Sequence, residues 1–495
     1  MTMTIYQMLA RNARKFPACL AVTDDQQELN WQELARQVER TAAWLRQEQG
    51  VQAGDRVALV LPNSIAFIVG FFAIQRLDAI AVPINVRLTT PELEYILGDA
   101  EAKLVLTCSM TDSALKPLIE QGLAGLWLDD FSVMAGVSVG ELDVPLAESD
   151  RPALLLYTSG TTGRPKGVLF QHTAIHAVAT MIALEMAMTP HSKLLHLMPF
   201  THSAPLNLFL MAGTLVGAAH VVAPTFTPDL LLSLVPKHQV THFFGAPVAY
   251  LLTAQQPTVE TADLSSVSHW IYGGAAMSTE QTQLVQKAFG SDQFYCVYGL
   301  TEAGPSGTLL LPHEHATKAG SVGQRAAFNT EVRLRTETGQ EPATGEPGEV
   351  EISGEGMMQC YWNNPDATTA AFTADGWLKT GDVAIRDEDG FYWIKDRKKD
   401  IIISGGVNLY PREIEDALAA HPAVIEAAVI GVPHKEWGET VKAFVILRQP
   451  LAAPQQELSE FLQERLADYK LPRLYEVMDE LPRNANGKVL KHQLG

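Results

Sequence analysis

The sequence contains little cysteine and fewer basic than acidic residues. Its 495 residues include four cysteines, which are far apart and form no metal-ligand spacing. This pattern is typical of reduced thiols and disfavours a disulfide-stapled scaffold. Lysine and arginine number 37 against 56 aspartate and glutamate residues, so the formal net charge is −19. Such an excess of negative charge disfavours a nucleic-acid partner and docking on an anionic membrane.

Long apolar runs are also missing. The most apolar stretch, Ile65 to Ile74, spans about 10 residues, and a bilayer crossing needs about 20. The first residues lack an apolar segment followed by a small-residue cleavage site, and the last five, KHQLG, carry no peroxisomal or lipidation signal. We therefore expect a cytoplasmic protein with no integral membrane association.

The composition that remains is globular, with 47% hydrophobic and 19% charged residues. A chain of 495 residues exceeds one ordinary core, so we expect at least two domains. In the first half, helical patterns such as residues 31–45 and 65–75 alternate with short apolar strands such as 57–62. This alternation predicts an α/β fold of doubly wound, parallel sheets, in which ligands bind beyond the carboxyl ends of strands.

The pattern changes near Asn329. Residues 330–339, 348–354 and 390–397 alternate with period two and predict antiparallel hairpins, a β-rich subdomain. A compact charged segment follows, with a predicted helix and strands of an α+β type. We place a boundary at Asp396, between an N-terminal domain of residues 1–395 and a small, mobile C-terminal domain of residues 396–495.

The strongest local signal is the string YTSGTTGRPKG at residues 157–167. Its glycines let the backbone approach an anion closely and aim N–H groups at it. The string is not a Walker loop, because Gly167 stands where Ser or Thr would follow the lysine. Donors suited to a polyphosphate come from six of its residues: Thr158, Ser159, Gly160, Thr161, Thr162 and Lys166.

The ordered string TSGTTGxPKG resembles the adenylate-forming superfamily of acyl-CoA synthetases, firefly-type luciferases and non-ribosomal-peptide adenylation domains. Further motifs follow in that family's order over nearly the whole chain. The resemblance implies that this loop binds the phosphates of ATP, with Thr158 in the catalytic set. As a glycine- and threonine-rich run alone, the loop would read equally well as a flexible surface loop.

Two later loops complete the nucleotide site by the same resemblance. The YGGAA loop is expected to lie against the adenine through Gly273, Gly274 and Ala275. The YGLTE motif is expected to contact the nucleotide through Tyr298, Gly299 and Thr301, and to hold Mg²⁺ through Glu302. Mg²⁺ prefers one or two carboxylates plus phosphate oxygens and water, so a single glutamate suffices. Taken alone, the YGGAA loop could be a plain tight turn, and Glu302 could be a solvated carboxylate.

By the same resemblance, the C-terminal motifs imply further ligands of the nucleotide, a hinge, a coenzyme A loop and a catalytic lysine. Asp382 in a TGD motif is expected on the ribose, Arg397 on the ribose or phosphate, and Asp396 at the hinge. A GGxNxYP signature implies contact with the pantetheine arm of coenzyme A, and Lys488 in the last loop is the expected catalytic lysine. The predicted coenzyme A contacts are Ser404, Gly405 and Gly406.

The acyl pocket is predicted from a PxxH-like motif and the apolar loops near it. His202 is expected near the substrate carboxylate, and Asn207 is the polar residue that could read a hydroxyl or a second carboxylate. Phe244, Gly245 and Gly273 complete the predicted lining. No aspartate follows a phenylalanine here, as it does in the amino-acid-activating relatives, which disfavours an α-amino acid.

Together these motifs predict an ATP- and Mg²⁺-dependent acyl-CoA synthetase that forms an acyl-adenylate and then an acyl-CoA. The segments TLLL at 308–311 and KAGSVG at 318–323 most resemble fatty-acyl-CoA synthetases, so a medium- or long-chain fatty acid is the expected substrate. Alternatives are an aryl or a small dicarboxylic acid, an acyl-AMP ligase that loads a carrier protein, a luciferase-like oxygenase and a nucleotide sensor. A homodimer stays open.

Overall fold

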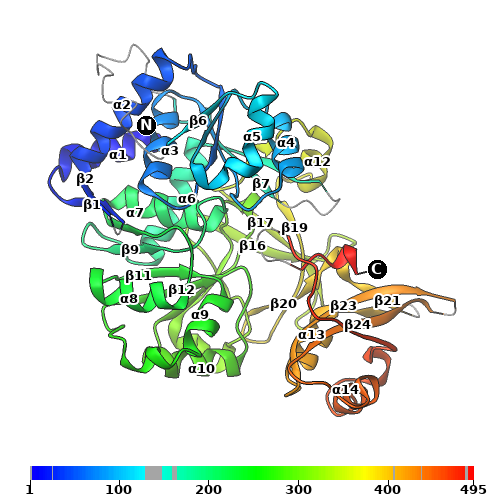
Figure 1. The fold of residues 1–495 in the computed structure, drawn as a ribbon. Coiled ribbons are helices and arrows are strands. Elements are labelled where there is room, and N and C mark those ends of the chain that lie inside the picture. Colours follow the sequence, from blue (N-terminus) through cyan, green and yellow to red (C-terminus); the bar gives the residue numbers. More distant parts are fainter. Residues whose placement is uncertain are drawn as a thin grey trace. The chain divides into compact units, whose positions relative to one another are not determined.

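The computed structural model describes residues 3–24, 26–128, 148–158, 164–404, 407–435, 437–484 and 489–494. The chain forms two compact units (Figure 1). Unit 1 comprises residues 1–332 and 351–379, and unit 2 comprises residues 333–350 and 380–495. The predicted domains, residues 1–395 and 396–495 with a hinge at Asp396, stay a prediction.

The larger sheet of unit 1 has nine strands within the described residues. Six consecutive strands run parallel, while antiparallel pairs close both edges. In spatial order the strands are β15 (Arg325–Ala326), β14 (Thr308–Leu310), β13 (Phe294–Val297), β12 (His269–Gly273), β11 (His242–Gly245), β9 (Lys193–His196), β10 (Ala219–Val222), β1 (Leu20–Thr23) and β2 (Glu28–Asn30).

The second sheet of unit 1 has seven strands within the described residues and is also mixed. Its parallel part is buried on both faces, and Val60, Val82 and Val105 have no exposed surface. In spatial order the strands are β18 (Cys360–Tyr361), β8 (Lys166–Gln171), β7 (Pro152–Thr158), β4 (Ile80–Pro83), β3 (Arg56–Val60), β5 (Leu104–Thr107) and β6 (Gly125–Trp127).

Several helices of unit 1 begin at polar caps, and the helices cover these sheets. At the start of α2, for example, the side chain of Asn30 accepts from the Glu33 backbone and Glu33 bonds back to Asn30. α8, α9 and α10 pack side by side, with α9 against β11 (Figure 1). The helices are α1 (Ile5–Lys15), α2 (Trp31–Gln47), α3 (Ile65–Arg76), α4 (Thr90–Asp99), α5 (Asp112–Glu120), α6 (His172–Glu185), α7 (Met211–Val216), α8 (Pro228–His238), α9 (Pro247–Ala254), α10 (Thr279–Phe289), α11 (His315–Lys318) and α12 (Pro365–Ala371).

A four-stranded sheet contains the points at which the chain passes between the two units. Its strands, in spatial order, are β16 (Thr330–Arg335), β17 (Gly348–Gly354), β19 (Leu378–Arg386) and β20 (Tyr392–Arg397). The first, second and fourth of these were predicted from alternation. β19 was not, because its sequence LKTGDVAIR contains glycine and two consecutive polar positions at the TGD motif. Asp382 therefore stands within a strand rather than in a hairpin turn.

Within its described residues, unit 2 also contains a five-stranded sheet with two α-helices. Ile402, Ile414, Val429 and Leu458 are buried in its apolar core. The strands are β22 (Val407–Leu409), β21 (Ile402–Ser404), β24 (Gly438–Leu447), β23 (Val424–His434) and β25 (Leu474–Val477), and the helices are α13 (Pro411–Ala419) and α14 (Pro454–Gln463). The predicted α/β class with a small α+β C-terminal part is confirmed.

Two features depart from the expected pattern. Both large sheets are mixed rather than wholly parallel, since β7 and β8 form a hairpin and β14 runs against β13. Before α7, residues Ala204–Leu210 form a π-helix, a wider turn that is frequent at functional sites. Within the described ranges, none of the helices combines the length and the apolar character that a membrane span needs.

Candidate functional site

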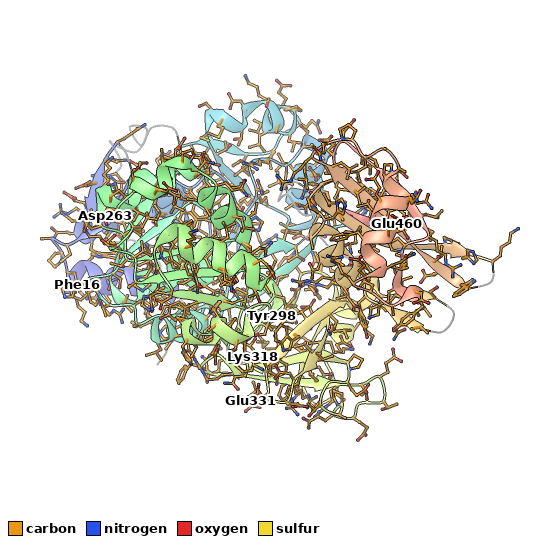
Figure 2. All side chains as sticks on the ribbon, turned by 90° about the horizontal axis from the view of Figure 1, so that it is seen from below. Phe16, Asp263, Tyr298, Lys318, Glu331 and Glu460 are labelled. Carbon is orange, nitrogen blue, oxygen red and sulfur yellow. The ribbon has the colours of Figure 1, made fainter. Side chains whose placement is uncertain are left out.

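The predicted site residues of unit 1 follow the carboxyl ends of neighbouring strands. β11 ends at Gly245, β12 ends at Gly273 and β13 ends directly before Tyr298, which Figure 2 labels. These three strands are adjacent and parallel in the nine-stranded sheet. Since parallel strands end at one edge, the sheet brings the predicted acyl and adenine loops together there, as expected of an open α/β sheet. His202 lies on the connection that leaves β9, the next strand along.

The phosphate-loop string spans the tip of a β-hairpin. Thr158 at the end of β7 pairs directly with Lys166 at the start of β8. Gly167 is required for packing, because a Cβ there would lie 2.9 Å from Leu155 Cδ1 and 3.1 Å from Trp362 Cβ. The hairpin thus holds both ends of the loop in register. Four of the predicted ATP contacts lie outside the described residues: Ser159, Gly160, Thr161 and Thr162.

Tyr157 fixes the base of the same hairpin. Its hydroxyl donates to Asp99 Oδ2 over 2.6 Å. Burial, together with this hydrogen bond to a carboxylate, raises the pKa of Tyr157 far above its ordinary value. The phenol therefore stays neutral and acts as a permanent donor that anchors the end of β7 to the end of α4.

Glu302 and Lys166 share a neighbour that the motifs did not identify. The Tyr361 hydroxyl donates to Glu302 Oε1 at 2.8 Å, and Lys166 Nζ lies 5.0 Å from the centre of the Tyr361 ring. Tyr361 belongs to β18, which pairs antiparallel with β8 beside Lys166. The lysine of the phosphate loop and the predicted metal carboxylate are thus joined through one aromatic side chain.

The segment that carries Glu302 is held by close backbone packing. A Cβ on Gly299 would lie 2.2 Å from the Pro305 carbonyl oxygen. Gly304 has φ +84°, and a Cβ there would lie 2.3 Å from the Gly356 carbonyl oxygen. Neither position accepts a side chain without backbone movement. Thr301 opens the short 3₁₀ turn that contains Glu302, whose carbonyl accepts from Met358 N at 2.8 Å.

These residues fit a magnesium ion that is shared with a substrate. The hydrogen bond from Tyr361 uses one oxygen of Glu302, and a cation can bind through the other. Among the described residues, no group of three or more His, Cys, Asp and Glu side chains gathers as a protein-only metal site would require. The donor set therefore suits Mg²⁺, which takes phosphate oxygens and water as its remaining ligands.

The two glycines at the end of β12, Gly273 and Gly274, have different roles. A Cβ on Gly273 would lie 2.8 Å from the Val297 carbonyl oxygen and 3.5 Å from Phe244 Cε2, so neighbouring protein atoms fill that space. Gly274 has φ +83° and open space where its Cβ would be, and Ala275 beside it is exposed. Room for a flat ring therefore exists at Gly274 and Ala275, whereas Gly273 permits close contact between strands.

The predicted acyl pocket residues surround the π-helix. Asn207 is fully buried; its Nδ2 donates to Ser203 Oγ at 3.1 Å, and its Oδ1 has no partner among the described residues. Phe209 and Phe244 pack with ring centres 6.3 Å apart, which connects the π-helix to β11. Gly245 is needed for packing, since a Cβ there would meet the Phe243 ring at 3.0 Å.

Asp382 and Arg397 pair with each other in unit 2. They are directly opposite residues of β19 and β20, with Arg397 Nε 2.7 Å from Asp382 Oδ1. Arg397 also donates to the Thr380 carbonyl at 3.1 Å, and the Thr380 hydroxyl donates to the Val350 carbonyl. Because the two predicted nucleotide ligands are cross-strand neighbours, the sheet holds their side chains next to each other.

Asp396, the predicted hinge, is buried and links two elements. Its Oδ1 accepts from the Arg397 backbone, and its Oδ2 accepts from the Arg412 backbone at 2.7 Å, at the start of α13. Burial raises the pKa of Asp396 above its ordinary value, and the positive charge of Lys491 opposes that shift. The carboxylate thus ties the end of β20 to α13.

The last two motifs lie on loops whose ends are paired. Ser404 pairs with Val407 in the hairpin of β21 and β22, and Gly405 and Gly406 lie outside the described residues. Arg483 forms a bridge with Val489, and Lys488 also lies outside the described residues. Each loop therefore begins and ends at residues that the surrounding structure holds.

Comparison with known proteins identifies the family. Residues 9–362 match the family described as AMP-binding enzyme, and residues 413–488 match the AMP-binding enzyme C-terminal domain. The chain belongs to the AMP-binding enzyme family. Within it, the chain falls in the acyl-CoA synthetase branch of the adenylate-forming superfamily, which confirms the resemblance drawn from the motifs.

Relatives in this family cover the whole chain. The chain is 37% identical to a feruloyl-CoA synthase from an Amycolatopsis species, over 98% of this chain and 97% of that one. It is 35% identical to a long-chain-fatty-acid–CoA ligase from Bacillus subtilis, over 99% and 94%. Among solved structures, o-succinylbenzoate coenzyme A synthetase from Bacillus subtilis with ATP and magnesium superposes with a TM-score of 0.91 at 30% identity, over 100% of both chains.

Two contacts, one in each unit, could not be predicted from the motifs. Tyr361 touches Glu302 through pairing between β18 and β8, which are almost 200 positions apart in the chain. Lys491 pairs with Glu415 of α13 at 2.7 Å. Glu415 belongs to the EIE end of the GGxNxYP signature, and Lys491 follows Lys488 by three positions, so their sequence neighbourhood was the available signal.

Proposed function

We propose that this enzyme converts an apolar monocarboxylic acid, with a medium- or long-chain fatty acid as first candidate, into its coenzyme A thioester. The chain is an AMP-forming acyl-CoA synthetase, and its substrates are a carboxylic acid, ATP and coenzyme A, with Mg²⁺ as cofactor. The family supports this class of reaction. The identity of the acid is the proposal.

The observation that carries the proposal is that the segments expected to line the acyl pocket lack charged side chains. Residues 203–210, 243–247 and 272–276 contain no lysine, arginine, aspartate or glutamate. The first two segments contact each other through the buried rings of Phe209 and Phe244. A second carboxylate on the substrate would need a cationic partner in such a buried place. An apolar acyl body needs none, so the segments suit a monocarboxylic acid.

In the first step, a carboxylate oxygen of the acid attacks the α-phosphorus of ATP and pyrophosphate leaves. The backbone and hydroxyl donors of residues 158–166, together with Lys166, bind and orient the phosphates. When bound, Mg²⁺ would neutralise phosphate charge, and Glu302 is the side chain that would hold it. Lys488 adds positive charge where negative charge grows on the phosphoryl oxygens. His202 lies near the incoming carboxylate.

In the second step, the sulfur of coenzyme A attacks the acyl carbonyl carbon and AMP leaves. This step needs the Ser404–Gly406 loop where the first step needs Lys488. Rotation of residues 396–495 about Asp396 would exchange the two groups at one place. Asp396 is suited to such a hinge, because its carboxylate is hydrogen-bonded to the backbone at both Arg397 and Arg412.

An aryl acid is the second candidate. The relative with 37% identity is a feruloyl-CoA synthase, and aromatic rings gather beside the π-helix. His196 also packs on Phe209 with ring centres 5.2 Å apart, and burial lowers its pKa well below the ordinary value, so it adds no charge. The Oδ1 atom of Asn207 could accept a hydrogen bond from a hydroxyl on such an acid.

Pyrophosphate exchange tests the proposal. The purified enzyme is incubated with ATP, Mg²⁺ and labelled pyrophosphate, together with octanoate, palmitate, a cinnamate or a dicarboxylate. Exchange that is fastest with the fatty acids supports the first candidate, and exchange that is fastest with the cinnamate supports the second. Faster exchange with the dicarboxylate overturns the apolar-pocket argument. Release of AMP that needs coenzyme A, rather than a carrier protein, identifies the acceptor.

A further inference from the structure

The Tyr361 side chain connects two groups of the proposed ATP site. Its hydroxyl donates to Glu302 Oε1 at 2.8 Å, and its ring lies below Lys166 Nζ at 5.0 Å. We propose that Tyr361 is a positioning residue that orients Glu302 toward the magnesium ion of the bound nucleotide and holds Lys166 toward its phosphates. This inference rests on the proposed function.

The backbone fixes Tyr361 in this place. Tyr361 pairs with Val168 of β8, and the next residue, Trp362, donates from its backbone N–H to the Gly167 carbonyl at 2.7 Å. The Tyr361 backbone N–H donates to Thr368 Oγ1 at 3.0 Å. With the backbone held on both sides, few directions remain for the ring, and one of them leads to Glu302.

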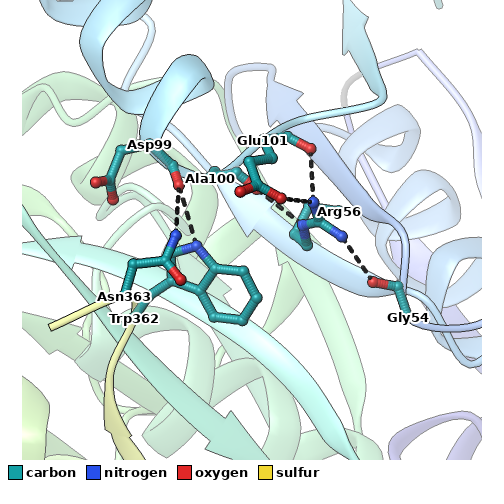
Figure 3. A network of polar contacts seen from close by, with 7 residues as sticks. All are labelled: Gly54, Arg56, Asp99, Ala100, Glu101, Trp362 and Asn363. Atoms are coloured by element: carbon teal, nitrogen blue, oxygen red, sulfur yellow. Dashed lines mark hydrogen bonds and ion pairs between the residues drawn. The ribbon is translucent and has the colours of Figure 1, made fainter. Parts of the chain in front are cut away.

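Trp362, which directly follows β18, contacts a different set of residues. The indole Nε1 of Trp362 donates to the Asp99 carbonyl at 3.0 Å, and the Arg56 guanidinium lies 5.5 Å from its ring centre. Arg56 in turn pairs with Glu101 at 2.8 Å (Figure 3). Trp362 therefore supports the scaffold, while Tyr361 reaches the proposed site.

A phenol suits this position chemically. As a neutral donor it orients the Glu302 carboxylate without cancelling the negative charge that a cation needs, as an arginine in its place would. As an aromatic face it attracts the Lys166 ammonium without neutralising the positive charge that phosphates need. Tyr361 thus contacts both groups and leaves the charge of each available to a ligand.

Calorimetric titration of ATP, with and without Mg²⁺, tests the assignment without reference to turnover. Tyr361→Phe removes the hydroxyl and keeps the ring over Lys166. We expect its affinity for ATP to fall about tenfold when Mg²⁺ is present and to stay at the wild-type value when Mg²⁺ is absent. Tyr361→Leu also removes the ring, so its affinity should fall in both conditions.

Trp362→Phe is the matched control. It keeps the Cβ that packs against Gly167 but loses the hydrogen bond to Asp99, so it should lower the melting temperature and leave both ATP affinities unchanged. Equal affinities of Tyr361→Phe and wild type in the presence of Mg²⁺ would overturn the inference. So would a loss of the same size with and without Mg²⁺, which signals a merely structural role. Wild-type enzyme that binds no ATP would refute the proposed function instead.

Discussion

The candidate residues of the two units are held by different kinds of partner. In unit 1, Glu302 accepts from a neutral phenol and Lys166 lies over an aromatic face. In unit 2, Asp382 lies 2.7 Å from an arginine, and Lys491 lies 2.7 Å from Glu415. Neutral partners leave charge available for a ligand, whereas ionic partners already satisfy one another.

This difference corresponds to the division of work that we propose. A site that binds a triphosphate with its cation needs charges that are fixed but unpaired, and close packing at Gly299 and Gly304 supplies the rigidity. A domain that presents alternative groups benefits from ion pairs that keep its own elements together as it moves. The pair of Asp382 and Arg397 and the pair of Glu415 and Lys491 each join two elements within unit 2.

The largest expected effect on the reaction rate comes from replacing Lys488, the proposed catalytic lysine of unit 2. Lys488→Ala should slow acyl-adenylate formation by about 10²–10³-fold, because a well-placed donor to the phosphoryl oxygens is lost. Thioester formation from supplied acyl-AMP should be largely intact. Each half-reaction is followed separately by quenched-flow chromatography. An equal loss in both would show that the residue supports the domain and does not act in one step.

Acid should destabilise unit 1 through buried histidines. Burial lowers the pKa of His172 to about 4, and its Nδ1 accepts from the Ile5 backbone N–H at 3.3 Å. An unfolded histidine titrates near 6.5, so below that pH the unfolded chain binds the extra proton first. Stability should therefore fall as pH drops from about 6.5 to about 4, by an amount on the order of 3 kcal/mol for this residue.

Urea unfolding at a series of pH values checks this expectation. His172→Gln should flatten the acid limb of the stability curve, while the same change at exposed His191 should leave that limb unchanged. An acid limb of wild-type steepness in His172→Gln would mean that other groups control it. His269, whose pKa burial also lowers to about 4, is the next residue to replace.

A smaller effect is expected at an ion pair formed by Lys491, three residues after the proposed catalytic lysine Lys488. Lys491 forms an ion pair with Glu415 of α13. Burial raises the pKa of Glu415, and the positive charge of Lys491 opposes that shift. Lys491→Met should slow adenylate formation about tenfold and spare thioester formation, because only the first step of the proposed mechanism uses Lys488. Lys491→Arg should restore the rate. A loss that is equal in both half-reactions would contradict a positioning role.

The smallest effect is expected at an exposed pair of the same unit. Arg386 and Glu341 lie 2.8 Å apart, with 40% and 58% of their side chains exposed. Surface pairs of this kind contribute about 0–1 kcal/mol. Arg386→Gln should therefore change the free energy of unfolding by less than about 1 kcal/mol and leave both half-reactions at wild-type rates. A larger change would mean that this exposed pair stabilises unit 2 more than surface ion pairs ordinarily do.

Much of the fold could be predicted because its signals are local. The apolar run at residues 57–62 predicted β3, and helical spacing at residues 31–45 and 65–75 predicted α2 and α3, with ends close to those of the structure. The π-helix of Ala204–Leu210 could not be predicted, because its composition is that of any buried helix. β19 was missed because a functional motif interrupts its alternation.

Candidate site residues could be predicted where they belong to a contiguous motif. They could not be predicted where strand pairing brings distant residues together. Thr158, Glu302 and Asp382 stand inside short recognisable strings. Tyr361 has no such string, and its role follows from the pairing of β18 with β8. Likewise, the separate roles of Gly273 and Gly274 follow from which of them faces the Val297 carbonyl, a fact of tertiary packing.

The most direct test of the central claim is a single turnover without coenzyme A. Enzyme in excess is mixed with ATP, Mg²⁺ and a medium- or long-chain fatty acid, and the products are identified by mass spectrometry. Formation of enzyme-bound acyl-AMP together with pyrophosphate, followed by acyl-CoA and AMP when coenzyme A is added, is the expected result. Formation of ADP and an acyl phosphate, or no reaction of ATP until coenzyme A is present, would contradict it.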